Sequence, residues 1–208
     1  NQVRFHNNEI SVSKSWDELV VDFYFAKGKK VIITSLSTAD EKLLRQAVEG
    51  CLGLIDAVKE REDYAPLPEG PFRYPALAGL YDKRLAELGE EAADLVEKAI
   101  NSALEAGAKR AAGTFYYGEE RISVATSGEA EGEFSRTRGE LYLRGLANGE
   151  STGVGVTCGT RVEDLKPELA GKEAGEYAKL SEKTVSVEEG RYDVVFGRPA
   201  LGVLFDWA

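Results

Sequence analysis

The spacing of apolar residues over the first 62 positions predicts three strands followed by a helix. The three segments are Ile10–Ser15, then Leu19–Ala26 with strong alternation of apolar and polar side chains, then Lys30–Ser35. Polar or glycine-containing turns separate them. Apolar residues then recur at intervals of three and four up to about Glu62, behind a capping box that begins at Thr38. This pattern is typical of an antiparallel β-meander followed by a helix.

The same series of elements returns downstream. Shifting the sequence by 122 positions places Glu131 under Glu9, and strand-like segments and turns then align in the same order. Arg161–Leu180 supplies a second helix. Residue identity between the two copies is low, but a conserved order at a fixed offset indicates a repeated supersecondary unit. We therefore predict an internal duplication, with copies at about 9–62 and 131–181.

Further elements are predicted between and after the two copies. They are a connecting helix over about 83–106, a hairpin formed by 110–117 and 120–127 that reverses at Gly118 and Glu119, and strands at 184–187 and 192–196. The whole pattern predicts an α+β fold of duplicated antiparallel meander-plus-helix units, with the helices packed on one side of curved sheets.

The two ends of the chain indicate a piece of a longer protein. No Met is present, and the first residues already alternate as in a strand. Arg198–Ala208 has the pattern of an apolar helix that begins at a proline and ends without a cap. We expect one duplicated domain over residues 1–190 and the start of a truncated C-terminal domain at 191–208.

Composition and charge disfavour several classes of protein. Hydrophobic residues make up 43% and charged residues 30% of the 208 positions, as in an ordinary globular protein. The net charge of −10 argues against nucleic acid as a partner, because that binding depends on Lys and Arg contacts to phosphate. The apolar runs at 31–33 and 200–205 are too short to cross a membrane, and no secretory signal is visible, which favours the cytoplasm.

Candidate catalytic residues are scarce. His6 is the only histidine, so a nucleophile relay would depend on one side chain of an N-terminal strand. Cys51 and Cys158 lie far apart in the sequence and, with a single histidine, lack the paired spacing of zinc ligands. Cys51 falls on the apolar face of a predicted helix, where a thiol behaves as a small hydrophobe. We predict no catalytic, cofactor-binding or metal-binding residue in this chain.

Two clusters allow a functional and a structural interpretation. Alternate residues of the acidic stretch Glu129–Glu133 would share one strand face, and a solvated face explains them better than an acid–base pair. Gly153, Gly155 and Gly159 resemble a dinucleotide loop only loosely, because their spacing is wrong and they lie inside a predicted strand. Close strand packing or a bulge is the favoured interpretation.

Several stretches, taken in order, resemble one known family. They are Asn7–Ile10 with the strands that follow, Ser127–Arg138, Gly171–Ala174 and Gly190–Phe196. None is a catalytic signature, so the resemblance rests on their order, and it covers nearly the whole chain. On this basis the chain resembles the N-terminal domain of the TldD/PmbA family, also called modulators of DNA gyrase.

The resemblance implies a cytoplasmic metallopeptidase that works as a homodimer or as a heterodimer with a family subunit. Such an enzyme takes unfolded peptide into an enclosed cavity, and its metal-bearing members hold zinc through a His-Glu-x-x-x-His helix. This chain would then provide dimer surface and a β-lined wall for peptide, with catalysis in an absent C-terminal domain or a partner subunit.

One departure from the family pattern falls near the end of the chain. When 202–205 are aligned with the residues before the metal motif, Asp206 and Trp207 stand where His-Glu is expected. This resembles the PmbA/TldE-like branch, whose members lack the metal site and act as partners of a metal-bearing subunit. The alternative from another class is a non-enzymatic protein-interaction module whose duplicated sheets assemble with a partner.

Overall fold

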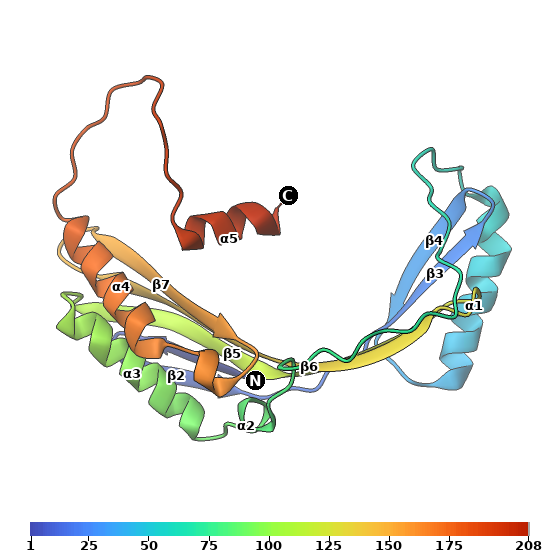
Figure 1. Cartoon of the computed structure of the whole chain (residues 1–208), viewed down its shortest axis with the longest axis horizontal. Coiled ribbons are helices and arrows are strands. Elements are labelled where there is room, and N and C mark those ends of the chain that lie inside the picture. Colours follow the sequence, from blue (N-terminus) through green and yellow to red (C-terminus); the bar gives the residue numbers. More distant parts are fainter. Residues whose placement is uncertain (208) are drawn as a thin grey trace. The chain divides into compact units, whose positions relative to one another are not determined.

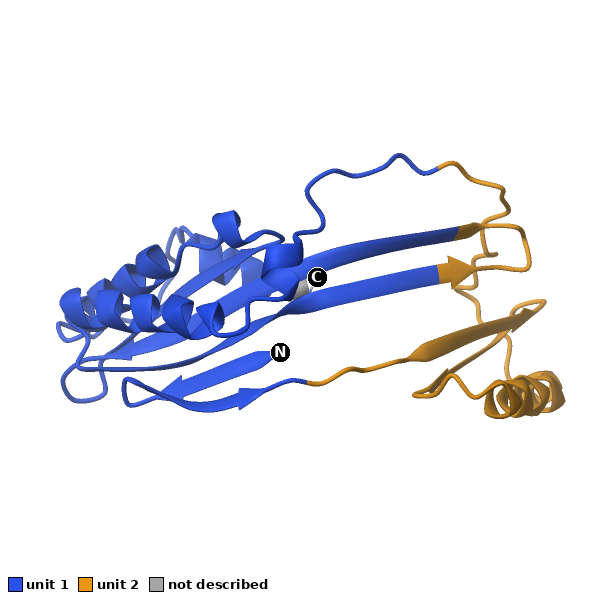
Figure 2. Ribbon diagram, turned by 90° about the horizontal axis from the view of Figure 1, so that it is seen from below, with its two compact units in different colours: residues 1–15, 74–123, 132–208 blue, residues 16–73, 124–131 orange. Residues whose placement is uncertain are grey.

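The computed structural model describes residues 1–207, apart from the side chain of Asp206, and shows the α+β architecture that the sequence predicts (Figure 1). Antiparallel strands form two sheets, and helices pack against them. The chain divides into two compact units, each assembled from segments that are distant in sequence (Figure 2). Unit 1 comprises residues 1–15, 74–123 and 132–208, and unit 2 comprises residues 16–73 and 124–131.

Unit 1 is built on a five-stranded sheet. Its order is β2-β1-β5-β6-β7, so that strands from both halves of the sequence lie side by side. The register places Val3 of β1 beside Phe115 of β5, and both side chains are buried. The strands are β1 (Gln2–His6), β2 (Glu9–Lys14), β5 (Arg110–Ala125), β6 (Glu131–Leu146) and β7 (Thr152–Gly159), and the far ends of β5 and β6 extend into unit 2.

Two long helices cover one face of this sheet. They are α3 (Glu91–Glu105) and α4 (Pro167–Leu180), which contact each other along their length, and α4 also lies along β7 (Figure 1). Apolar side chains at helical spacing on α3, such as Ala92, Val96 and Ala99, join Leu141 and Leu143 of β6 in the core. The short α2 (Lys83–Ala86) precedes α3, the turn η2 (Val162–Asp164) precedes α4, and α5 (Arg198–Asp206) follows.

Unit 2 contains a two-stranded hairpin and a helix. The elements are β3 (Val21–Lys27), β4 (Lys30–Leu36), α1 (Glu41–Leu54) and the turn η1 (Ile55–Ala57). Cys51 and Ile55 are buried, and Lys27 Nζ pairs with Asp56 Oδ1 at 2.7 Å. The N-cap of α1 is Asp40, whose Oδ1 accepts from the N–H of Leu43, so the helix begins after a different cap from the predicted Thr38.

The predicted hairpin at Gly118 and Glu119 is wrong. β5 runs through both residues without a break, and Glu120 within it pairs with Arg136 of β6 at 2.5 Å. The chain reverses instead at 126–130, where Glu129 has φ 60° and Thr126 N–H donates to the carbonyl of Ala130. Pairing with a long neighbouring strand therefore outweighs the local glycine signal.

The connecting helix predicted over 83–106 is interrupted. α2 ends at Ala86, and Gly89, which has the left-handed φ of +55°, lets the chain change direction before α3. The strands predicted at 184–187 and 192–196 are also wrong, because no residue from 184 to 197 lies in a strand.

The predicted three-strand meander is only partly formed. β2 pairs with β1 in the large sheet, whereas β3 pairs with β4 in the small one. In the second copy the first two predicted strands merge into the single strand β6. The element order that does recur is a hairpin followed by a helix, as β3–β4–α1 and as β6–β7–α4. Within the described residues, no helix is both long and apolar enough to span a bilayer.

Candidate peptide-binding surface

The helix-covered face of the five-stranded sheet is packed backbone to backbone. A Cβ at Gly171 of α4 would lie 2.1 Å from the carbonyl oxygen of Ala99 on α3, so glycine is required for this approach. On the other side of α4, a Cβ at Gly155 of β7 would lie 1.8 Å from the carbonyl oxygen of Ala170. This face has no room for a ligand, and α4 is held closely between α3 and β7.

These contacts explain the glycines whose spacing loosely resembles a dinucleotide loop. Gly153 and Gly155 lie on the inner face of β7 against the backbone of α4, which confirms the interpretation as close packing. Gly159 lies at the end of β7, near the side chain of Asp164.

The opposite face of the same sheet is uncovered by any described helix. Along β6, alternate residues from Thr137 to Gly145 are buried, and the residues between them are exposed or partly exposed. The uncovered face includes Arg4 of β1, Tyr116 of β5, Tyr142 of β6 and Val156 of β7, with Arg4 opposite Thr114 and Tyr142 opposite Val156. A broad face of mixed aromatic, apolar and cationic side chains is therefore open to a ligand.

Two edge strands flank this face. β2 and β7 are the end strands of the sheet, so one side of each has main-chain N–H and C=O groups without a neighbouring strand in the described chain. β2 is exposed along most of its length. Such edges bind extended peptides by adding a strand through main-chain hydrogen bonds, with little demand on peptide sequence.

Some polar side chains of the uncovered face are already paired. Arg138 Nη2 lies 2.5 Å from Glu140 Oε2, and Gln2 Nε2 donates to the Tyr116 hydroxyl at 2.6 Å. These contacts orient side chains at the surface without covering it.

The histidine and the two cysteines of the chain do not form a common site. His6 ends β1 and is exposed, Cys51 is buried in α1 of unit 2, and Cys158 is exposed on β7, with both thiols free. Across the described residues, no three His, Cys, Asp or Glu side chains gather closely enough to hold a metal ion. The residues present therefore do not fit a zinc site.

The acidic stretch 129–133 is divided between a turn and a strand. Glu129 lies in the turn, Glu131 begins β6, and Glu133 lies 3.9 Å from Arg121. All three are exposed. Glu131 and Glu133 fit the predicted solvated strand face, and the prediction is wrong for Glu129.

A partly buried polar cluster lies beside the sheet, where β6 and the chain after β7 meet the start of α2. The N–H of Asp82 donates to Thr137 Oγ1 at 2.9 Å, and that hydroxyl donates to the carbonyl of Thr160 at 2.6 Å. Asp82 Oδ2 accepts from the N–H of Val162 at 3.0 Å. Hydrogen bonds from the N–H groups of Val162, Arg84 and Leu85 hold the pKa of Asp82 below its ordinary value. A satisfied, fixed carboxylate of this kind is structural.

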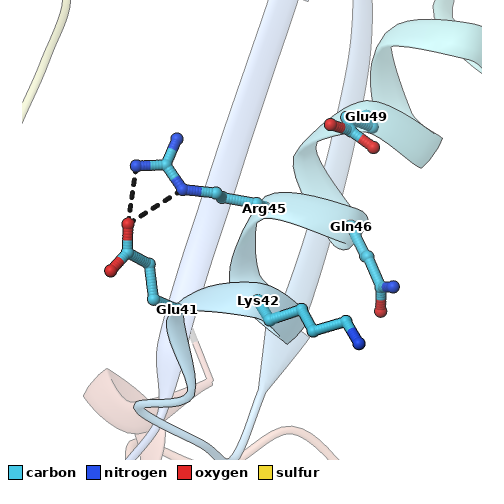
Figure 3. A pocket seen from close by; sticks show the side chains of 5 residues that line it. All are labelled: Glu41, Lys42, Arg45, Gln46 and Glu49. Atoms are coloured by element: carbon cyan, nitrogen blue, oxygen red, sulfur yellow. Dashed lines mark hydrogen bonds and ion pairs between the residues drawn. The ribbon is translucent and has the colours of Figure 1, made fainter.

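Two shallow depressions mark the helices. In one, on α1, Arg45 Nη2 and Glu41 Oε1 pair at 2.6 Å, while Lys42 and Gln46 point away from that pair (Figure 3). The other lies between α3 and α4 and includes Glu105, Glu168 and Lys172. Neither brings an acid and a base together in an enclosed space, so neither has the form of a catalytic pocket.

Comparison with known proteins identifies the family. Residues 85–182 match the model described as the PmbA/TldA metallopeptidase central domain. These residues form a domain of the TldD/PmbA family. The matched segment runs from within α2 to just beyond α4 and includes β5, β6 and β7 of the five-stranded sheet but not β1 and β2, whereas the sequence alone suggested one N-terminal domain over 1–190. A comparison with curated protein sequences gives no match.

Solved structures share the TldD/PmbA fold seen here. A proposed modulator of DNA gyrase from Thermotoga maritima is similar at a TM-score of 0.66 and 20% identity, over 86% of this chain and 41% of that one. A second proposed modulator of DNA gyrase, from Bacteroides thetaiotaomicron, is similar at a TM-score of 0.69 and 16% identity, over 86% of this chain and 42% of that one. TldE from Thermococcus kodakarensis is similar at a TM-score of 0.63 and 17% identity, over 86% of this chain and 41% of that one. This TldD/PmbA chain thus spans about two fifths of the length of each.

The uncovered face was missed by sequence reasoning, although a signal for it exists. Arg110, Thr114 and Tyr116 are spaced at even intervals in β5, and Tyr142 and Arg144 follow the same period in β6. A strict alternation of buried and polar residues over strands this long indicates a sheet with one face open.

Proposed function

We propose that this chain forms part of a TldD/PmbA-type metallopeptidase subunit and provides a wall that binds unfolded peptide, together with surface for dimerisation. Catalysis resides in a part of the protein, or in a partner subunit, outside this chain. The observation that supports this proposal is the five-stranded sheet of unit 1, which is sealed by helices on one face and open on the other, with edge strands β2 and β7.

Main-chain recognition suits an enzyme that acts on unfolded polypeptide. An extended segment can pair with an edge strand through N–H and C=O groups that every sequence has, while alternate side chains rest on the sheet. The packing of α4 along β7 holds that edge strand in place, which limits the ordering cost of binding there.

A separate surface supports association with another protein. The segment after α4 and the helix α5 expose large apolar side chains, including Val195 at 97%, Phe205 at 78% and Trp207 at 86%. Large exposed apolar areas of this kind mark protein contacts. We propose that they are covered by the remainder of the subunit or by its homodimeric or heterodimeric partner.

The family's metal has no ligand set among the described residues of this chain. Zinc is therefore proposed for a metal-bearing family member or partner subunit, and no chemical step is assigned to residues of this chain. Assignment to the metal-free PmbA/TldE-like branch rests on Asp206 and Trp207. The Asp206 side chain lies outside the described residues, and Trp207 is exposed. The cytoplasm stays the predicted location.

Peptide binding through the strand edges is tested with two matched peptides. The first is an unstructured, fluorescently labelled peptide, and the second has the same sequence with alternate backbone nitrogens methylated. Methylation removes the donors needed for pairing with an edge, so we expect binding to the full-length protein to weaken about tenfold. Equal binding of both peptides would contradict recognition by strand addition. Binding that never leads to cleavage with any family subunit would favour the interaction-module alternative.

A further inference from the structure

Positive charge gathers on the uncovered face of the five-stranded sheet, although the chain as a whole has a net charge of −10. Arg4, Arg110 and Arg144 lie on three adjacent strands of unit 1, and Lys14 lies on edge strand β2 opposite Gln2. All four side chains are exposed. A cluster of positive charge on a protein of negative net charge indicates a surface that binds anionic groups.

The strand register places these cations on one face of the sheet. Arg4 lies opposite Thr114, which is four residues along β5 from Arg110 and therefore on the same face. The N–H of Lys109 donates to the carbonyl of Leu146 at 2.7 Å, so Arg110 lies beside the end of β6, where Arg144 is two residues from Leu146. Residues two apart on a strand are separated by roughly 7 Å, and adjacent strands by about 4.8 Å.

These four cations are available to a ligand. None of them forms an ion pair with a carboxylate of the described residues, whereas Arg136 and Arg138 on the same face are paired with Glu120 and Glu140. Glu120 and Glu140 of this face are thus already engaged by other arginines. Lys14, Arg4, Arg110 and Arg144 remain to bind anionic groups from outside.

Two tyrosines lie among the arginines. Tyr116 is 46% exposed and Tyr142 is 39% exposed, and each offers a flat apolar ring beside the cations. An arginine binds a carboxylate through two parallel hydrogen bonds, and a tyrosine ring packs on the aliphatic part of a peptide side chain. In an extended peptide, alternate side chains point the same way and match the two-residue spacing of the sheet.

We propose that the uncovered face of the five-stranded sheet selects acidic segments of unfolded polypeptide. This inference rests on the proposed function, because it names the class of peptide that the open sheet binds. A short acidic peptide is favoured over nucleic acid, since four cations on a protein of net charge −10 do not provide the extended phosphate contacts that nucleic-acid affinity requires.

The test uses the full-length protein and three unstructured peptides of one length, with Glu, Gln or Lys at alternate positions. The variant is Arg4→Gln combined with Arg144→Gln. The control is Arg121→Gln. Arg121 is an exposed arginine of the neighbouring strand β5, on the opposite face of the sheet and 3.9 Å from Glu133. Circular dichroism confirms that each variant is folded before fluorescence anisotropy measures binding.

We expect the Glu peptide to bind about tenfold more tightly than the Gln peptide, and the double variant to remove this preference while Arg121→Gln retains it. Added salt should weaken binding of the Glu peptide. Equal affinity for the Glu and Gln peptides would overturn the inference, as would an unchanged preference in the double variant. Tighter binding of a single-stranded oligonucleotide, lost in the same variant, would also overturn it.

Cleavage assays distinguish a failure of the acidic selection from a failure of the proposed peptidase role. Cleavage of the Gln peptide by the reconstituted enzyme, without any preference for Glu, would overturn the acidic selection and leave the peptidase role intact. Selective binding of the Glu peptide with no cleavage of any peptide would support the acidic selection and count against the peptidase role.

Discussion

At the scale of the residue, glycine decides how closely α4 approaches α3. Replacing Gly171 by Ala would place a methyl group 2.1 Å from the carbonyl oxygen of Ala99. We expect Gly171→Ala to lower the free energy of unfolding by about 1–3 kcal/mol, although alanine favours helices. Gly50→Ala in α1 is the matched control, because nothing lies within 4 Å of its Cβ position. It should stabilise α1 by about 0.5–1 kcal/mol.

Hydrogen exchange of the amides in α4 and in α1 reports these two glycine changes locally. Faster exchange in α4 of Gly171→Ala and slower exchange in α1 of Gly50→Ala would agree with the packing described. Stabilisation of α4 by Gly171→Ala would show that the two helices are not held at this distance.

Thr137 gives a second prediction at this scale. Its hydroxyl is fully buried, accepts from the N–H of Asp82 and donates to the carbonyl of Thr160. Thr137→Val keeps the shape but leaves both backbone groups without this partner, so we expect a loss of about 1–3 kcal/mol in urea unfolding. Thr137→Ser keeps the hydroxyl and should lose less. A valine variant as stable as the serine variant would contradict a role for this hydrogen bond.

The lowered pKa of Asp82 leads to a prediction for the stability of the protein in acid. Its folded-state pKa is lowered, chiefly by the N–H of Val162, so the unfolded chain binds a proton at higher pH than the folded chain does. The stabilisation is therefore fully present above the unfolded value near 3.8 and is lost as the pH falls through the lower folded value. Thermal unfolding below about pH 4 should be less steeply pH-dependent in Asp82→Asn. An identical acid profile in both proteins would contradict this.

At the scale of the element, strand partners and chain reversals were harder to predict than strand type. The alternation in 110–125 correctly indicates a strand, but whether Gly118 turns the chain depends on β6, whose pairing is not local. In the predicted helix over 83–106 the opposite happens: the apolar spacing is continuous, but the chain is interrupted at Gly89, which has a left-handed conformation. Periodicity reports which face is buried, whereas partner and boundary depend on contacts distant in sequence.

The segment after α4 gives a prediction of its own. It has strand-forming composition at 184–187 and 192–196 but no strand in the described chain, and Val195 and Phe205 are exposed at 97% and 78%. The substitutions Val195→Lys and Phe205→Lys should therefore reduce self-association of this chain, measured by light scattering, without lowering the unfolding temperature. A clear drop in unfolding temperature would show that these side chains are buried in the folded chain.

At the scale of the whole molecule, the family and the fold class were within reach of the sequence, while the set of strands that form the open face was not. The order of short stretches such as Ser127–Arg138 pointed to TldD/PmbA, and the match over 85–182 agrees. The open face depends on β1 and β2 joining β5, which places Arg4 beside Thr114 across more than a hundred positions. No local pattern encodes that neighbour.

The central claim is that this chain binds unfolded peptide and depends on zinc held elsewhere for cleavage. The most direct measurement is hydrolysis of a quenched, unstructured fluorescent peptide by the chain alone, by a complete metal-bearing family subunit, and by both together, each with zinc and with a chelator. We expect no cleavage by the chain alone, and zinc-dependent cleavage that the chain enhances when the metal-bearing subunit is added. Zinc-dependent cleavage by this chain alone would contradict the account.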